Sequence, residues 1–299
     1  MLKVRLFLSL ICLSLSAATF AQNGIRQIHQ ERSLYRNIIV TEDSTRRCMR
    51  FTITSRIGQN QSCRFLKDSQ RLVFPYAKMT LSSLLVQDNP ERILIVGLGG
   101  GTLPNAYHSL FPQAKIIISE IDEAVLRVAK NFFNFTESEQ VSVKVGDARV
   151  YIKRAALKNE KFDLIILDAF NGEYIPEHLM TYEFLQEVKS LLTHDGMVVS
   201  NTFSNSRLYD AESVTYRQVF GEMFSIRMNN TGNRVLIATM QPLPDANTLF
   251  TLAPALQKRL NNFDIKISEY PSKMSTEVDW NIRERPLSDQ YSPANLLNN

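Results

Sequence analysis

The chain has few of the residues that hold metals or act as catalytic nucleophiles. Among its 299 residues are four histidines and three cysteines, and no histidine lies at helical ligand spacing from another histidine or from a cysteine. No serine lies in a nucleophile-elbow pattern, and no cysteine resembles a catalytic thiol beside a histidine. We therefore expect neither a metal site nor a covalent serine or thiol mechanism.

The surplus of charge is also small. The formal net charge is +4 at pH 7, and loss of Lys3 and Arg5 with an N-terminal leader leaves 32 basic against 30 acidic residues. Such a surplus is too small for a nucleic-acid surface, so we expect small-molecule partners and no nucleic acid. A chain of this length that is 44% hydrophobic can form a large sheet domain and a small appended domain.

Long apolar runs are absent beyond the first residues, where Leu6 to about Leu15 form one. Basic residues precede this run and small residues ending at Ala21 follow it, a pattern typical of a secretory signal at residues 1–21 that is cleaved after Ala21. The run is short for a membrane span, so we expect a periplasmic or secreted protein without a stable membrane anchor. An uncleaved anchor is the alternative, and Cys12 would be lost with the signal.

Two cysteines, Cys48 and Cys63, remain after cleavage. They flank an expected hairpin of CMRFTITS and QSCRFL, with Gly58-Gln59-Asn60 near its turn. Export would place them in an oxidising compartment, which favours a disulfide. Two half-buried thiols on neighbouring strands are the alternative.

The most informative stretch runs from Arg92 to Asp122, RILIVGLGGGTLPNAYHSLFPQAKIIISEID. An apolar run typical of a parallel strand is followed by a glycine loop that contains Gly97, Gly99, Gly100 and Gly101. Glu120 ends the second strand, 23 residues after Gly97, where a carboxylate can accept hydrogen bonds from ribose hydroxyls. The stretch predicts a nucleoside-binding βαβ unit.

Two later strands also end on acids, at Asp147 in VSVKVGDA and at Asp168 in FDLIILDAFN. The strand ends of a doubly wound sheet converge on one crevice, so Glu120, Asp147 and Asp168 are expected to face one ligand. Three carboxylates suit an adenosine with a cationic sulfonium better than a pyrophosphate. Glu120 would then bind ribose, Asp147 the adenine amino group, and Asp168 would lie near the reacting centre. Turn or helix-cap roles are the alternative for the two aspartates.

These motifs resemble those of the spermidine and spermine synthases, the polyamine aminopropyltransferases. The resemblance rests on VGLGGGT, SEID, VGDA and LDAFNGEYIPEHLMTYEFLQEVKSLLTHDGMVVSN, and upstream on Tyr35 and LVFPYAKM. It places residues 97–102 on the family's glycine motif, Glu120 on its ribose-binding acid, Asp147 with Ala148 on its adenine-binding pair, and Asp168 on its catalytic aspartate. The DAFNG motif is similar to that of divergent bacterial members.

The resemblance implies transfer of an aminopropyl group from decarboxylated S-adenosylmethionine to an amine, with release of methylthioadenosine and with no permanently bound cofactor. It implies that Asp168 and Tyr76 are catalytic, that Gly97, Gly99 and Gly101 bind the donor, and that Tyr76 and Asn171 contact the acceptor. It also implies a homodimer. A Tyr76 that only packs against the sheet is the alternative to its catalytic role.

Departures from the family pattern concern the amine acceptor. Gly100 and Asn171 stand where the housekeeping enzymes carry aspartates, Lys78 replaces a glutamate, and Arg36 replaces a glutamine that touches the nucleoside. Each lost carboxylate removes a charge-assisted hydrogen bond worth about 1.5 to 3 kcal/mol. We therefore expect an acceptor that is putrescine or a different amine, and we hypothesise that Arg36 and Lys78 form an anionic subsite.

Two other functions stay open at this stage. A methyltransferase that uses ordinary S-adenosylmethionine would hold the donor carboxylate on the backbone of Gly99 to Thr102 and the adjoining helix N-terminus. A non-catalytic protein would keep the nucleoside pocket and bind thioadenosines or polyamines.

The expected fold is α/β, a Rossmann-like doubly wound sheet of the S-adenosylmethionine-methyltransferase type at residues 86–299, with a small N-terminal β domain at residues 22–85. Five helices are expected in the larger domain: Leu103–Leu110, Glu123–Phe132, Ala148–Leu157, Thr181–Leu192 and Asp245–Asn261. FSIRMNN and NRVLIATM are expected to close the sheet as an antiparallel pair. His178 is expected at a helix start, with a place in the cleft as the alternative.

Overall fold

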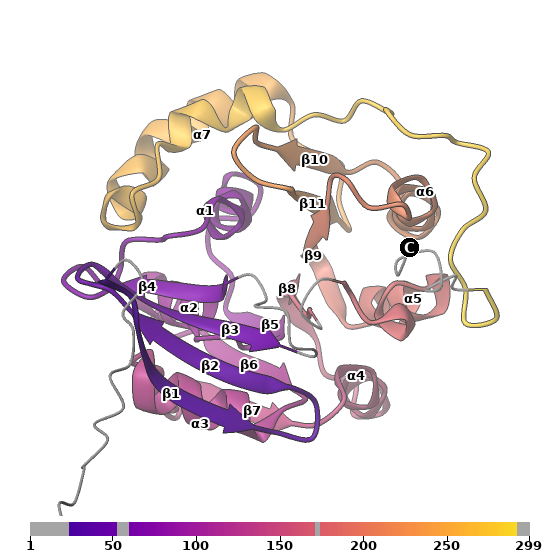
Figure 1. The fold of residues 1–299 in the computed structure, drawn as a ribbon. Coiled ribbons are helices and arrows are strands. Elements are labelled where there is room, and N and C mark those ends of the chain that lie inside the picture. The colour runs from indigo at the N-terminus through magenta and orange to yellow at the C-terminus, as the bar shows by residue number, and fades with distance from the viewer. Residues whose placement is uncertain (1–23, 53–59, 171–173, 292–299) are drawn as a thin grey trace, which may run out of the picture.

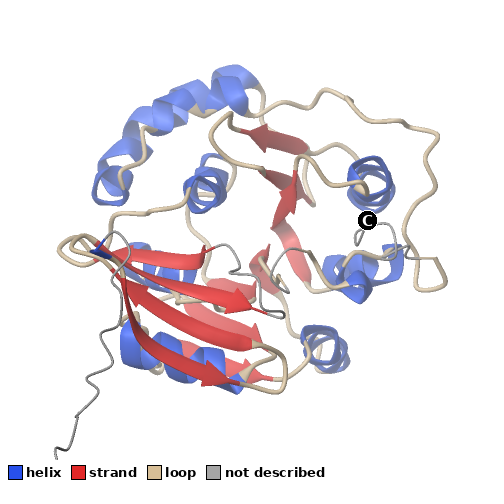
Figure 2. Ribbon diagram, viewed as in Figure 1, coloured by secondary structure: helices blue, strands red, loops and turns tan. Residues whose placement is uncertain are grey.

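The structure is a computed structural model that describes residues 24–52, 60–170 and 174–291. It contains two sheets, a small antiparallel one and a large one of seven strands (Figure 1). The large sheet has helices on both faces, as Figure 2 shows by colour. The expected α/β class, with a Rossmann-like sheet and a small N-terminal β sheet, is confirmed.

The small sheet has the order β1-β2-β3-β4. Its strands are β1 (Arg26–Arg32), β2 (Asn37–Glu42), β3 (Arg46–Thr52) and β4 (Asn60–Phe65). In β2, Ile38 and Val40 are fully buried and alternate with partly exposed residues, as expected of a strand with one covered face. The sequence predicted β2, β3 and β4, whereas Gly58 and Gln59 of the expected turn lie outside the described residues.

Cys48 and Cys63 form the expected disulfide. They are directly opposite each other in the β3–β4 ladder, with Cα atoms 4.1 Å apart. The two cysteines are 15 positions apart in the sequence. Without the bridge, only the hydrogen bonds of the β3–β4 ladder would hold this segment closed. It therefore fixes β4, whose Ser62 lies against the glycine loop of the large sheet.

Replacing both cysteines by serine is expected to lower the free energy of unfolding by about 3 kcal/mol, because a loop of this length regains its entropy in the unfolded chain. Urea denaturation of the double variant, compared with wild-type protein under oxidising and reducing conditions, measures the effect. Wild-type protein with reductant should match the variant. An unchanged unfolding midpoint would show that the bridge does not contribute to stability.

The large sheet has the order β10-β11-β9-β8-β5-β6-β7. Its strands are β5 (Arg92–Val96), β6 (Lys115–Glu120), β7 (Val141–Val145), β8 (Phe162–Leu167), β9 (Leu192–Phe203), β10 (Phe224–Arg227) and β11 (Asn233–Thr239). The five strands from β7 to β9 in this order are parallel, and β11 and β10 close the sheet as the expected antiparallel pair. The change of direction brings the start of β11 beside the end of β9.

Helices cover the two faces because residues of each central strand alternate between two cores. In β5, Ile93 and Ile95 face one core, whereas Leu94 and Val96 face the other. Helices α1, α2, α3 and α7 pack in the first core, and α4, α5 and α6 in the second. The α-helices are α1 (Pro75–Leu81), α2 (Thr102–Leu110), α3 (Glu123–Phe132), α4 (Ala148–Leu157), α5 (Tyr182–Ser190), α6 (Tyr209–Phe220) and α7 (Ala246–Leu260). Short 3-10 helices are Ser82–Leu85, Glu177–Leu179, Asn261–Phe263, Ile267–Glu269 and Pro271–Lys273.

The two sheets share a core across the expected division of the chain. Ile38 and Met49 of the small sheet belong to the same buried cluster as Ile93 of the large sheet. Helix α1 packs against β9 and β11, so it lies with the large sheet. The division at residue 85 stays a prediction. No helix in the described part of the chain has the length and apolar character needed to cross a bilayer.

Candidate active site

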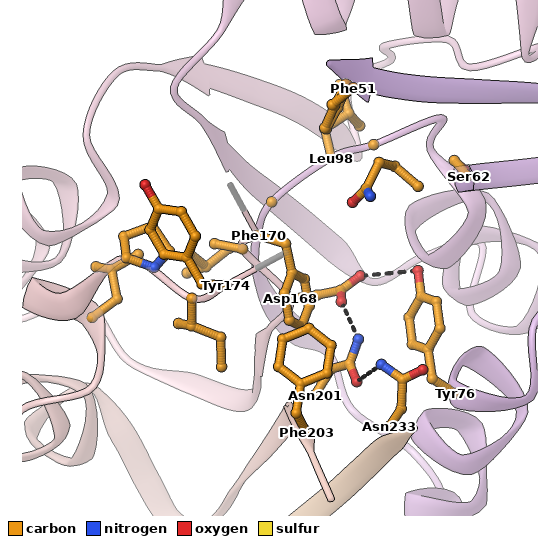
Figure 3. A pocket seen from close by; sticks show the side chains of 18 of the residues that line it. Phe51, Ser62, Tyr76, Leu98, Asp168, Phe170, Tyr174, Asn201, Phe203 and Asn233 are labelled. Carbon is orange, nitrogen blue, oxygen red and sulfur yellow. Dashed lines mark hydrogen bonds between the residues drawn. The ribbon is translucent and has the colours of Figure 1, made fainter. Parts of the chain in front are cut away.

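A cavity of about 1110 Å³ lies at the carboxyl ends of the parallel strands, between the large sheet and the small one. Side chains from both sheets and from the loops after β5, β6, β8 and β9 line it (Figure 3). The lining includes seven of the residues predicted for the site: Tyr76, Gly97, Gly99, Glu120, Asp147, Ala148 and Asp168. The structure therefore brings these residues together, while their individual roles stay predictions.

Gly97 turns the chain directly after β5. Its φ is +99°, and a Cβ atom built on it would lie 2.3 Å from the carbonyl oxygen of Asp168. Only glycine permits this approach, so Gly97 allows the loops after β5 and β8 to meet. Gly101, at φ +76°, caps the N-terminus of α2 against Phe135 and contributes no lining among the described residues of this cavity.

Glu120 closes β6 and is buried beneath the glycine loop. Its two oxygens accept hydrogen bonds from the backbone N–H of Leu98 and of Asp122, each at 2.9 Å. Burial raises the pKa of Glu120, while the two backbone donors and the Arg36 guanidinium oppose this. A carboxylate oxygen has two lone pairs, so each can accept one more hydrogen bond from ribose.

Asp147 has two structural partners. Its Oδ1 accepts from the backbone N–H of Val150 and so caps α4, at 2.9 Å, as the helix-cap alternative predicted. His178 Nε2 lies 2.9 Å from its Oδ2, and His178 itself lines the cavity. Asp147 therefore caps α4 and also lines the cavity. His178 reaches the cleft from the 3-10 helix Glu177–Leu179.

Asp168 follows β8 and lies at the centre of a hydrogen-bond network. Tyr76 donates its hydroxyl to Asp168 Oδ2 at 3.3 Å, and Asn201 donates Nδ2 to Asp168 Oδ1 at 2.8 Å (Figure 3). Burial raises the pKa of Asp168 from 3.8 to about 7, although both donors favour the carboxylate. Burial and the neighbouring carboxylate also hold the pKa of Tyr76 well above its usual value, so the tyrosine is a neutral donor.

Two residues of this network were missed at the sequence level, Asn201 and Asn233. Asn201 Oδ1 accepts from Asn233 Nδ2 at 2.9 Å, and Asn233 Oδ1 accepts from the Thr231 hydroxyl at 2.7 Å. Asn201 follows the apolar run of β9, so its place at a strand end was a usable signal. Asn233 starts the antiparallel β11, and no local pattern marks it.

Aromatic side chains form the wall beside Asp168. Phe170 and Phe203 meet edge to face, with ring centroids 5.1 Å apart, and both line the cavity next to Asn201 (Figure 3). Aromatic faces attract organic cations, and their apolar rings also exclude water from the centre of the site.

The hypothesis of an anionic subsite built from Arg36 and Lys78 is wrong. Lys78 Nζ forms an ion pair with Asp264 Oδ2 at 2.8 Å and contributes no lining among the described residues of the cavity. Arg36 lines the cavity and donates Nη1 to the carbonyl oxygen of Phe170 at 3.2 Å. Helix α1 directs Lys78 away from the cavity, whereas Tyr76, two residues earlier on the same helix, faces it.

Gly100 has no room for the aspartate of the family pattern. A Cβ atom there would lie 2.7 Å from Ser62 Oγ and 2.9 Å from Phe133 Cδ1. The neutral hydroxyls of Ser62 and Thr102 lie on this side of the loop, with Ser62 Oγ and Thr102 Oγ1 3.2 Å apart. Asn171 lies outside the described residues, and no three metal-ligating side chains converge in the part of the chain that is described.

Comparisons with known proteins show the family of the chain. The spermine/spermidine synthase domain matches residues 74–233. A polyamine aminopropyltransferase of Vibrio vulnificus (strain CMCP6) is 49% identical over 98% of this chain and 97% of its own length. The eEF1A lysine and N-terminal methyltransferase of Homo sapiens is 30% identical over 64% of this chain but only 30% of its own length.

Solved structures confirm the fold. A probable spermidine synthase from Corynebacterium glutamicum ATCC 13032 matches 86% of this chain and 98% of its own, with a TM-score of 0.64 and 20% identity. A spermidine synthase in complex with the transition-state analogue AdoDATO matches 86% of this chain and 82% of its own, with a TM-score of 0.57 and 20% identity. The family match and the 49% identity over nearly the whole chain carry the assignment: the chain belongs to the spermine/spermidine synthase family and is a transferase of the polyamine aminopropyltransferase type.

Proposed function

We propose that the protein transfers the aminopropyl group of decarboxylated S-adenosylmethionine to a primary amine and releases methylthioadenosine. The observation that carries this proposal is the environment of Asp168. The carboxylate lines the cavity, has its two oxygens oriented by Tyr76 and Asn201, and has a pKa raised to about 7. Such a group suits proton transfer from an amine near neutral pH.

The nucleoside half of the donor fits the strand ends. Glu120 would accept hydrogen bonds from the ribose hydroxyls, and Asp147 one from the adenine amino group. Gly97 and Gly99 bring the backbone close to the ligand. This leaves the sulfonium beside Asp168, where a buried carboxylate stabilises positive charge.

The reaction balances with these groups. The amine lone pair attacks the methylene carbon bonded to the sulfonium, so a C–N bond forms while the C–S bond breaks. The electron pair of the C–S bond stays on sulfur, which becomes the neutral thioether of methylthioadenosine. The proton of the amine passes to the Asp168 carboxylate, and the Tyr76 hydroxyl holds that carboxylate towards the amine.

Activity is expected to fall as the pH drops through about 7. Below the pKa of Asp168 the carboxyl is protonated and cannot accept a proton, so kcat/KM for the donor should decrease about tenfold per pH unit. The bound sulfonium lowers that pKa, so the acid limb of kcat should lie at lower pH. Steady-state rates between pH 5.5 and 9 at saturating acceptor measure both limbs, and a flat kcat/KM from pH 6 to 8 would contradict the role of Asp168.

Calorimetric titration of the mature protein tests the proposed donor. Methylthioadenosine, decarboxylated S-adenosylmethionine and S-adenosylmethionine are titrated separately, each with and without putrescine. Preference for the first two supports aminopropyl transfer and is followed by a screen of amine acceptors. A protein that binds none of the three has lost the proposed function.

A methyl transfer from S-adenosylmethionine is the second candidate, and the glycine loop favours it. Gly100 provides no carboxylate and no lining among the described residues of the cavity, whereas the neutral hydroxyls of Ser62 and Thr102 line it on this side of the loop. Such a site accepts a donor that also carries a carboxylate. The crystal structure of human methyltransferase-like protein 13 in complex with SAH matches 62% of this chain and 90% of its own, with a TM-score of 0.55 and 30% identity. Preference for S-adenosylmethionine in the same titration would support this function.

We also propose that the protein acts after export and as a homodimer. The signal pattern at residues 1–21 and the Cys48–Cys63 disulfide support an oxidising compartment. The family resemblance supports the dimer. N-terminal sequencing of protein recovered from cell fractions tests cleavage after Ala21, and light scattering of the mature protein tests its mass in solution.

A further inference from the structure

A chain of three polar side chains leads away from Asp168. Asn201 donates to the carboxylate through Nδ2 and accepts from Asn233 through Oδ1, at 2.8 and 2.9 Å. Asn233 accepts in turn from the Thr231 hydroxyl at 2.7 Å, and the backbone N–H of Asn233 donates to the same hydroxyl oxygen at 3.2 Å. Each of the two amides therefore has both of its ends hydrogen-bonded. Figure 3 shows the bonds from Asn201 to Asp168 and from Asn233 to Asn201.

The order of donors along this chain determines which end of the Asn201 amide faces Asp168. The Thr231 oxygen accepts from a backbone N–H, and its proton points to Asn233 Oδ1. Asn233 then presents its NH₂ group to Asn201 Oδ1, which leaves the NH₂ group of Asn201 for the carboxylate. With Asn201 turned over, a carbonyl oxygen would face Asp168, an arrangement that favours the protonated carboxyl.

A buried ion pair holds the outer end of the chain in place. Arg234, the residue after Asn233, is fully buried, and its Nη2 lies 2.7 Å from Glu212 Oε2 of α6. Its Nε donates to Thr202 Oγ1 at 3.0 Å, next to Asn201 in β9. Asn233 is paired with Phe203 in the β9–β11 ladder, so the two asparagines project from neighbouring strands with fixed spacing.

We propose that Asn233 is a positioning residue, which orients the Asn201 amide so that its NH₂ group stabilises the ionised Asp168 base. The inference rests on the proposed function, because it assigns Asn233 a part in the same proton transfer. Asn233 does not touch Asp168, and it acts through Asn201. The consequence is that loss of the chain should shift the acid limb of activity to higher pH without removing the base itself.

Substitutions of Asn233 and Thr231 leave the other titratable groups around Asp168 in place. Tyr76 of α1 is in direct contact with the carboxylate, whereas Glu120 ends β6 and Asp147 lies just after β7. Six other titratable or charged side chains line the same cavity among the described residues: Tyr35, Arg36, Tyr174, His178, Arg207 and Glu212. A shift that follows substitution of Asn233 or Thr231 is therefore assigned to the amide chain.

Two pairs of variants test the proposal in the full mature protein. Asn233→Ala and Thr231→Val remove the amide and the hydroxyl, and each should move the half-maximal pH of kcat/KM for the donor upward by about one unit. At pH 6.5 this is a loss of up to about tenfold, whereas at pH 9 the rates should approach wild type. Thr231→Ser keeps the hydroxyl and should restore the wild-type profile. Asn229→Ala, at an exposed position in the same turn, is the matched control.

A measurement that does not require turnover distinguishes failure of this proposal from failure of the proposed function. An infrared titration follows the carboxyl band of Asp168, identified by its loss in Asp168→Asn, in wild type and in Asn233→Ala. An upward shift in the variant supports the positioning role even where no aminopropyl transfer is found. Equal titration of both proteins, or a rate loss in Asn233→Ala that is the same at pH 6.5 and pH 9, would overturn it.

Discussion

Replacement of Asp168 by asparagine is expected to reduce turnover by about 10³-fold while methylthioadenosine still binds. Asparagine has the same shape and keeps an oxygen for the Asn201 NH₂ group, but it cannot accept the proton of the amine. Proton transfer by a positioned side chain contributes about 10²- to 10⁴-fold. Single-turnover rates and calorimetric titration with methylthioadenosine measure the two effects separately.

Tyr76→Phe is the graded comparison for this variant. It removes the hydroxyl that orients Asp168 Oδ2 but leaves the base, so the loss of turnover should be about tenfold to a hundredfold. Asp168→Asn should also gain thermal stability relative to wild type, and the gain should be larger at pH 8 than at pH 5. The folded-state pKa of about 7 lies above the ordinary value of 3.8, so the carboxyl costs the fold progressively more stability as the pH rises from about 3.8 to about 7. If the turnover of Asp168→Asn stays within tenfold of wild type, Asp168 is excluded as the base.

Local sequence patterns were sufficient for much of the fold and for the acidic part of the site. The boundaries of α3 and α4 agree with the predicted helices, because each has a cap residue before it, Asp122 and Asp147. Glu120, Asp147 and Asp168 could be placed in one cavity because parallel strands bring their carboxyl ends to the same edge. Such inferences require only the strand period and the direction of each strand.

Features that depend on packing between distant segments could not be predicted. Asn233 meets Asn201 through an antiparallel register that no local pattern encodes. Strand β1 has four charged or histidine side chains among seven residues, RQIHQER, so it lacks the apolar alternation of its neighbours. Lys78 was assigned to the site from its position after Tyr76, but α1 directs it to Asp264, a residue 186 positions away.

Gly97→Ala is expected to be the most damaging single substitution outside the charged residues of the site. The new Cβ would lie 2.3 Å from the carbonyl oxygen of Asp168, so the loops after β5 and β8 would have to separate. Overpacking of a buried site typically costs about 1 to 3 kcal/mol, and we expect Gly97→Ala to lose about 3 kcal/mol or more in the free energy of unfolding, because the conflict is with backbone atoms. Methylthioadenosine affinity should fall by more than about a hundredfold, since Glu120 and Asp168 would no longer face one ligand.

Gly221→Ala separates backbone strain from steric conflict in this experiment. Gly221 has φ +84°, close to the +99° of Gly97, but a Cβ atom there would meet nothing within 4 Å. Its substitution should therefore cost only the backbone strain of an alanine at positive φ, about 1 to 3 kcal/mol, and leave ligand affinity unchanged. Urea denaturation and calorimetric titration of both variants make the comparison. Equal losses of stability would mean that φ alone requires glycine at position 97, whereas a larger loss in Gly97→Ala shows that the approach to Asp168 requires it.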